Sequence, residues 1–198
     1  MNIKELLEIG SWEWPKNAGK MIQSTLADGR AGEPDRMAAA ELAGDLVVMN
    51  SGMADALLSV LRNPAEPELL RAKAAISFGA VLDLAYTDGF DEPDEIPISE
   101  AKYLSIKDTL QKLFLDESNP KQLRRRVLEA DVRSPEPWHE SAVREAYASG
   151  DEEWKLTAVF SMRWVPGFPK DILESLENKN PDLPKRKQVF LAIAVIVA

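Results

Sequence analysis

The chain has 198 residues, a net charge of −9 and an apolar content of 45%. This length and apolar content exclude a disordered chain and allow one elongated domain with a sizeable core over residues 1–198. The acidic balance disfavours nucleic acid as a partner, because polyphosphate binding needs clustered cations. The absence of Cys excludes disulfides, a thiol nucleophile and a thiolate metal site.

Residues 1–30 predict two short helices that cap the start of a helical array. The first ends at Gly10, and the second opens at Pro15 and ends near Gly29. Trp12 and Trp14 lie between them, where we expect aromatic side chains to cover an apolar end of the array. A secretory signal would carry a basic segment and a long apolar run here, so we expect a cytoplasmic protein.

The rest of the chain predicts helices in pairs. Apolar residues recur with a 3.6-residue period, and Pro, Asn or Asp residues open the helices. The expected pairs cover residues 34–49 and 51–62, 67–86 and 99–115, 120–132 and 137–149, and 152–165 and 168–176, followed by an unpaired helix over 181–198. The prediction is therefore an all-α fold of about four and a half helix pairs.

One acidic segment, residues 87–98, interrupts this pattern. It contains five acidic residues, two Pro and one Gly, which predicts an exposed loop insertion whose removal leaves the fold intact. Its carboxylates could hold a divalent cation, but they lack the ordered spacing of an EF-hand. We therefore expect a solvated loop and no metal.

A cationic side chain recurs near the start of the first helix of each pair, which we call the first helices; the second members are the second helices. The cations are Arg36, Arg71, Arg124, Lys155 and Lys185. The intervals are 35, 53, 31 and 30 residues, and the long one equals a single period plus an insertion of about 20 residues. A period of this length is typical of stacked helix pairs that share one continuous core.

The Pro-x-x-x-Arg-x-x-Ala phrase, as at Pro67–Ala74, and the 31-residue spacing resemble HEAT repeats, particularly the bacterial phycobilin-lyase HEAT-like type. The resemblance covers residues 33–198. It implies an α-α superhelix, and we expect first helices on the convex side and second helices on the concave side. Lys155 departs from the family pattern, so a repeated contact by the cation is not expected there.

Two classes of function follow. The favoured one is a non-enzymatic protein-binding or scaffolding module, since HEAT-like solenoids mostly serve as binding surfaces. Its candidate binding residues share an outward position on the second helices, on the expected concave face. They are Asp55, Ser59, Lys102, Asp108, His139, Arg144, Asp171 and Ser175.

The alternative is a HEAT-like enzyme or a lyase-type chaperone of a small ligand; a similarity to DNA-alkylation glycosylases fits less well, because the chain is acidic. A ligand-sized pocket with converging polar groups would favour this alternative, and a shallow continuous groove the binding module. No catalytic motif is present, and we expect neither an enzyme nor a cofactor.

Two further residue groups have simple interpretations. His139 is the sole histidine and lacks evident catalytic or metal-ligating partners, which predicts a partly exposed surface imidazole. Lys121 and Arg124–Arg126 form the one basic run. Successive helical residues point about 100° apart, so the run is not expected to form one phosphate-binding patch.

The segment 189–198, VFLAIAVIVA, is apolar at every position. As a helix it would span about 15 Å, which is too short for a bilayer, so we expect no membrane anchor. It would be the first helix of a fifth pair without its partner. We therefore expect either a homodimer through this end or a continuation of the solenoid that covers it.

Overall fold

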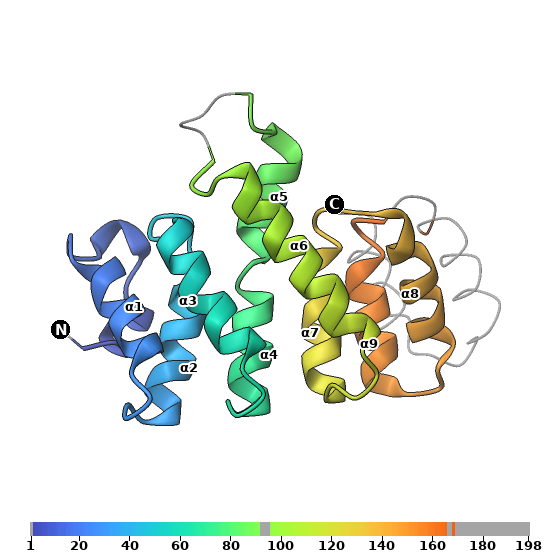
Figure 1. The fold of residues 1–198 in the computed structure, drawn as a ribbon, viewed down its shortest axis with the longest axis horizontal. Helices are drawn as coiled ribbons and strands as arrows, with labels where there is room; N and C mark the ends of the chain where they lie inside the picture. Colours follow the sequence, from blue (N-terminus) through green and yellow to red (C-terminus); the bar gives the residue numbers. More distant parts are fainter. Residues whose placement is uncertain (1, 92–95, 166–167, 169–198) are drawn as a thin grey trace, which may run out of the picture. The chain divides into compact units, whose positions relative to one another are not determined.

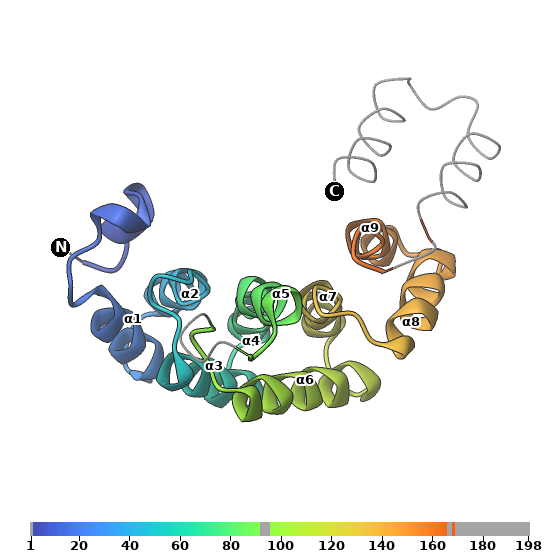
Figure 2. The ribbon, with the colours of Figure 1, turned by 90° about the horizontal axis from the view of Figure 1, so that it is seen from above.

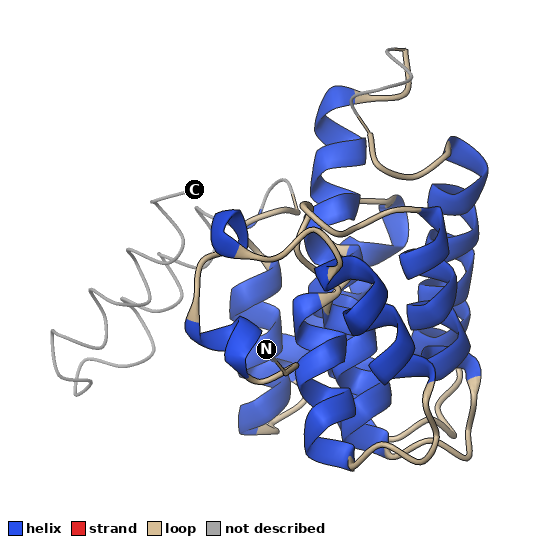
Figure 3. Cartoon of the chain, turned by 90° about the vertical axis from the view of Figure 1, so that its left-hand side faces the viewer, coloured by secondary structure: helices blue, strands red, loops and turns tan. Residues whose placement is uncertain are grey.

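The computed structural model describes residues 2–91, 96–165 and 168. The chain divides into two compact units, residues 1–134 and 135–198. The described residues form helices, turns and loops and contain no strand, which confirms the all-α prediction (Figure 1, Figure 3). The expected helices over 168–176 and 181–198, with Asp171, Ser175, Lys185 and the apolar segment 189–198, lie outside the described residues apart from Phe168.

The helices of the first unit form two layers. Figure 2 shows one layer containing α1 (Ala18–Ala27), α3 (Ser51–Arg62) and α6 (Glu100–Leu115). The other contains α2 (Glu33–Leu42), α4 (Glu68–Ile76) and α7 (Lys121–Asp131). Each helix packs on its predecessor or successor within its layer and on a helix of the other layer. This packing is compatible with an α-α superhelix, in which the expected first helices share one layer and the second helices share the other.

The N-terminal cap is partly as predicted. Two short 3₁₀ helices, η1 (Glu5–Glu8) and η2 (Ser11–Glu13), precede α1, and η1 contacts α2. The Trp14 indole N–H donates to the Leu6 carbonyl at 3.0 Å, and Leu6 is fully buried. Trp12, however, is 84% exposed, so the expectation that it covers the apolar end is wrong.

Two of the expected long helices are broken. α2 ends at Leu42 rather than residue 49, and the helix expected over 67–86 is split into α4 and α5 (Gly79–Asp88). Ser77 lies at this break. Its hydroxyl contacts the Lys73 carbonyl within α4 at 2.8 Å and the Ala40 carbonyl of α2 at 2.7 Å. A hydroxyl that bonds the preceding turn competes with continued helix, and here it also ties α4 to α2.

The predicted acidic loop is shorter and less exposed than expected. α5 continues to Asp88, and the Phe90 ring packs on Tyr103 with 5.4 Å between ring centroids. Ile96 and Ile98 are only 6% and 3% exposed, so the end of the segment contributes to the core. Residues 92–95, with most of the predicted acidic cluster, lie outside the described residues.

The second unit contains the antiparallel pair α8 (Pro137–Ala148) and α9 (Glu152–Ser161). Gly150 has a φ of 77°, a left-handed conformation that glycine commonly adopts just after a helix. Asp151 is the N-cap of α9, since its carboxylate accepts hydrogen bonds from the Glu153 and Trp154 amides.

Candidate functional site

The repeated arginines connect consecutive helices. In each case the Nε–H donates to a backbone carbonyl ten residues earlier, at the end of the preceding helix. The three bonds are Arg36 to Leu26 at 3.1 Å, Arg71 to Leu61 at 3.0 Å and Arg124 to Phe114 at 2.8 Å. A carbonyl at a helix C-terminus has no partner within its own helix, so a guanidinium is well suited to it.

The terminal guanidinium nitrogens of Arg36 and Arg71 contact the loop that precedes the first helix of the following pair. Arg36 donates to both carboxylate oxygens of Glu66 at 2.6 and 2.7 Å, and Arg71 lies 3.4 Å from Asn119 Oδ1. Glu66 directly precedes the proline before α4, and Asn119 directly precedes the proline before α7. The hydrogen bonds from Arg36 lower the pKa of Glu66, and burial lowers the pKa of Arg71. Arg36 and Arg71 therefore stabilise the packing of consecutive helices.

Lys155 differs from the arginines, as expected from its shorter reach and single ammonium group. Its ammonium donates to Glu152 of its own helix at 2.8 Å, in an exposed i,i+3 ion pair that raises the pKa of Lys155. The contacts of the basic run also diverge: Arg124 bonds α6, Arg125 bonds Gln122, and Arg126 pairs with Glu129.

The structure brings together two of the predicted binding residues on α3 and α6. Lys102 forms an ion pair with Asp55 across the two helices, so their charges compensate each other. Asp108 pairs with Lys112 of its own helix at 2.7 Å, and Ser59 is exposed.

His139 is fully buried, so the prediction of a surface imidazole is wrong. Its Nδ1 accepts the Glu136 backbone N–H at 2.8 Å, while the Glu136 side chain accepts the His139 N–H, in a capping box. The Trp138 ring packs on the imidazole at 3.9 Å between centroids. The histidine at the third helical position thus accepts the hydrogen bond from the N-cap backbone N–H that a Glu or Gln side chain usually accepts. Arg144 is exposed and lies over the Phe168 ring at 4.5 Å.

A groove crosses the layer of α2, α4 and α7 in the first unit. It has a volume of about 320 Å³ and is lined by seven residues of α2, α4 and α7. Its apolar lining includes Met37, Ile76 and Leu69, and Leu69 is 55% exposed. Lys73 and Arg126 contribute the positive charges, and none of the lining residues is acidic.

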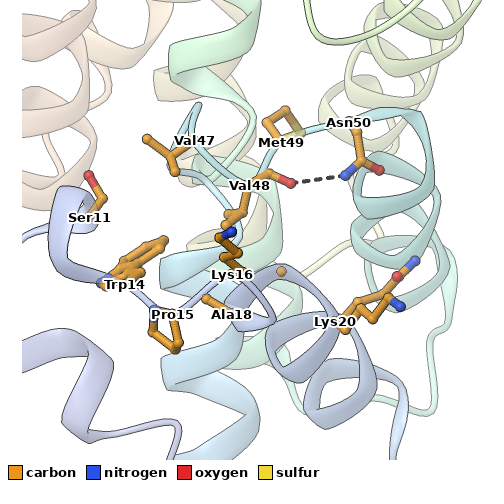
Figure 4. A pocket seen from close by; sticks show the side chains of 12 residues that line it. Ser11, Trp14, Pro15, Lys16, Ala18, Lys20, Val47, Val48, Met49 and Asn50 are labelled. Atoms are coloured by element: carbon orange, nitrogen blue, oxygen red, sulfur yellow. Dashed lines mark hydrogen bonds between the residues drawn. The ribbon is translucent and has the colours of Figure 1, made fainter.

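A larger cleft of about 610 Å³ lies at the N-terminal end of the same unit. Figure 4 shows its walls: Trp14, Pro15 and Lys16 from the segment that leads into α1, Lys20 from the first turn of α1, and Val47–Asn50 from the segment between α2 and α3. The volume is within the range of small-molecule sites.

Sequence reasoning did not identify this cleft. Its two walls are about 30 residues apart in the chain, so no local pattern joins them. The sequence predicts Trp14 only as a cap over the apolar end of the array. The available signal was local charge: residues 14–23 contain two lysines and no acid in a chain with 33 acidic residues.

No helix of the described residues is long and apolar enough to cross a membrane. Comparisons of the chain with protein-family models, with curated proteins and with solved structures gave no match.

Proposed function

We propose that the chain is a non-enzymatic module that binds a helical segment of a partner protein in the groove over α2, α4 and α7. The observation that carries this proposal is the apolar lining of the groove, in which Leu69 is 55% exposed and Met37 and Ile76 are half-buried. Apolar side chains that remain exposed in one groove are typical of protein-binding sites. An amphipathic helix is a common occupant of such grooves.

The charges of the groove favour an acidic edge on that helix. Lys73 and Arg126 line the groove, whereas the chain as a whole carries 33 acidic and 24 basic residues. Both cations already contact carboxylates, Lys73 with Glu41 and Arg126 with Glu129. The pairs are partly exposed, so a partner carboxylate can share these cations without the penalty of burying an isolated charge.

This surface differs from the one expected from the sequence, which used outward residues of the second helices. Asp55 pairs with Lys102 on that face and Asp108 pairs with Lys112 within its own helix, just as both groove cations are paired, so charge alone does not separate the two surfaces. The second-helix face stays a prediction, and one experiment can separate the two surfaces.

The experiment places a photo-crosslinking residue at position 69 or at position 104 and captures partners from the native lysate. Leu69 and Leu104 are matched, at 55% and 56% exposure, but lie on α4 and α6 respectively. We expect a protein that crosslinks at position 69 and whose capture without a crosslinker is lost with Leu69→Glu but retained with Leu104→Glu. A fragment of it that contains the crosslinked helix should bind the purified chain with the same dependence.

Two results would contradict the proposal. Crosslinking at position 104 together with loss of binding by Leu104→Glu would place the interface on the second-helix layer. Capture of the same proteins by wild type and Leu69→Glu would show that the groove binds none of them.

A further inference from the structure

We propose that the cleft beside Trp14 is a binding site for a small organic anion with a flat apolar body, such as an aromatic carboxylate or sulfonate. This inference is independent of the protein-binding groove on α2, α4 and α7. It rests on the charge of the cleft, on lysine side chains that have no partner among the described residues and on the fixed positions of its walls.

The charge of the cleft is positive. Lys16 and Lys20 are the charged residues among the twelve that line it, and no acidic residue takes part. The sign of this lining is opposite to the net charge of −9 of the chain as a whole. A cleft lined by one sign of charge attracts ligands of the opposite sign.

The two lysines form no hydrogen bond or ion pair with the described residues. Elsewhere in the described part of the chain, lysines are engaged: Lys4 pairs with Asp35, Lys73 with Glu41 and Lys112 with Asp108. The buried Lys107 pairs with Asp131. Two exposed ammonium groups beside a cavity, with no carboxylate partner in the described part of the chain, leave room for an anion supplied by a ligand.

The apolar part of the cleft is held in place by hydrogen bonds. The Trp14 indole N–H donates to the Leu6 carbonyl at 3.0 Å, which fixes the orientation of the ring at the wall of the cleft. Val47 stands opposite at 65% exposure (Figure 4). An inorganic anion would not use these surfaces, whereas an aromatic or alkyl body would cover them.

The polar side chains around the cleft are also fixed. Asn50 caps α3 by accepting the Met53 N–H at 3.0 Å and donates to the Val48 carbonyl at 3.1 Å. Gln23 donates to the Gly52 carbonyl at 3.0 Å. The walls of the cleft are therefore formed before any ligand arrives, so the conformational entropy lost on binding is mainly that of the two lysine side chains.

The test measures binding of three probes by isothermal titration calorimetry and ligand-observed NMR. The probes are 2-naphthalenesulfonate, the neutral 2-naphthalenemethanol and inorganic sulfate. We expect the sulfonate to bind at least about tenfold more tightly than either of the others, because it alone satisfies both the lysines and the apolar walls. Its affinity should fall as salt is added.

Matched variants locate the site. Lys16→Ala with Lys20→Ala should weaken sulfonate binding about tenfold, whereas Lys112→Ala, which removes an exposed lysine on α6, should leave it unchanged. Val47→Asp should weaken binding and Val47→Lys should strengthen it. Position 47 is exposed, so neither change disturbs the core, and circular dichroism melting checks that each variant is folded.

Equal affinity for the sulfonate and the neutral alcohol would overturn the assignment of an anion. Equal affinity for sulfate and the sulfonate would overturn the assignment of a flat apolar body to the ligand. No binding of any probe, equal effects of Val47→Asp and Val47→Lys, or equal loss in the Lys112→Ala control would overturn the site itself.

Discussion

Arg36 and Glu66, 30 residues apart in the sequence, face each other through two hydrogen bonds of 2.6 and 2.7 Å. Both side chains are largely buried, at 9% and 17% exposure. Because Arg36 also bonds the Leu26 carbonyl, one side chain connects the end of α1, the start of α2 and the loop before α4. A guanidinium makes all three contacts at once, which a lysine ammonium cannot reproduce.

Arg36→Lys should therefore lower the free energy of unfolding by about 1–3 kcal/mol, since a half-buried carboxylate and a helix-terminal carbonyl lose their guanidinium partner. The measurement is urea denaturation followed by circular dichroism. Arg30→Lys is the control, because Arg30 is exposed, and its expected effect is within about 0.5 kcal/mol. Equal stability of the two variants would show that the bidentate geometry contributes nothing.

Glu66→Gln should alter the pH dependence of stability. The hydrogen bonds from Arg36 lower the pKa of Glu66 below its ordinary value of 4.5. The pair therefore stabilises the folded state fully above that pH, and this stabilisation is lost as pH falls through the lowered pKa. The stability difference between wild type and Glu66→Gln should be constant from pH 8 to about pH 5 and shrink on further acidification. A difference that stays constant down to pH 3 would contradict the lowered pKa.

The sequence predicted the paired helices because their apolar periodicity and opening residues are local signals. The bounds of α3 and α6 follow them closely, with Asn50 and Ser99 as N-caps. The breaks after Leu42 and Ile76 were not predictable, since the bond that marks the second one joins Ser77 to a carbonyl 37 residues away. The recurrence of the arginines near the helix starts was visible in the sequence, but their shared contact ten residues upstream requires the folded geometry. The burial of His139 was likewise hidden, because its capping box uses an uncommon residue at that position.

Gly44→Ala tests the close approach of α2 and α4. A Cβ at position 44 would lie 2.9 Å from the Ser77 carbonyl oxygen and 3.1 Å from its Cα, so backbone atoms would have to move. We expect a loss of about 1–3 kcal/mol in the free energy of unfolding. Gly29→Ala is the matched control, because no atom lies within 4 Å of its added Cβ. A loss in Gly29→Ala as large as in Gly44→Ala would contradict the steric explanation.

Ile98→Ala tests whether the end of the predicted insertion belongs to the core. Ile98 is 3% exposed, so removal of its side chain beyond Cβ should lower the free energy of unfolding by about 2–5 kcal/mol. A freely solvated insertion would tolerate the change within about 0.5 kcal/mol. Thermal melting of Ile98→Ala beside Asp91→Ala, an exposed residue of the same segment, distinguishes the two descriptions.

The last prediction concerns the buried ion pair between α6 and α7. Lys107 Nζ lies 3.0 Å from Asp131 Oδ1, with side-chain exposures of 5% and 0%. The ammonium also donates to the Ser134 carbonyl, just after α7. Removal of one partner takes this ion pair away from a buried charge, so Lys107→Ala and Asp131→Ala should each lower the free energy of unfolding by about 3–5 kcal/mol.

The double variant of Lys107→Met with Asp131→Leu should lose much less than the sum of the two alanine variants, because it buries no isolated charge. The exposed pair of Asp108 and Lys112 supplies the comparison within the same helix. Its alanine variants should change stability by less than about 1 kcal/mol. Urea denaturation of all five variants measures these differences. Additive losses in the double variant would show that packing and backbone hydrogen bonds of Lys107, rather than charge compensation, account for the stabilisation.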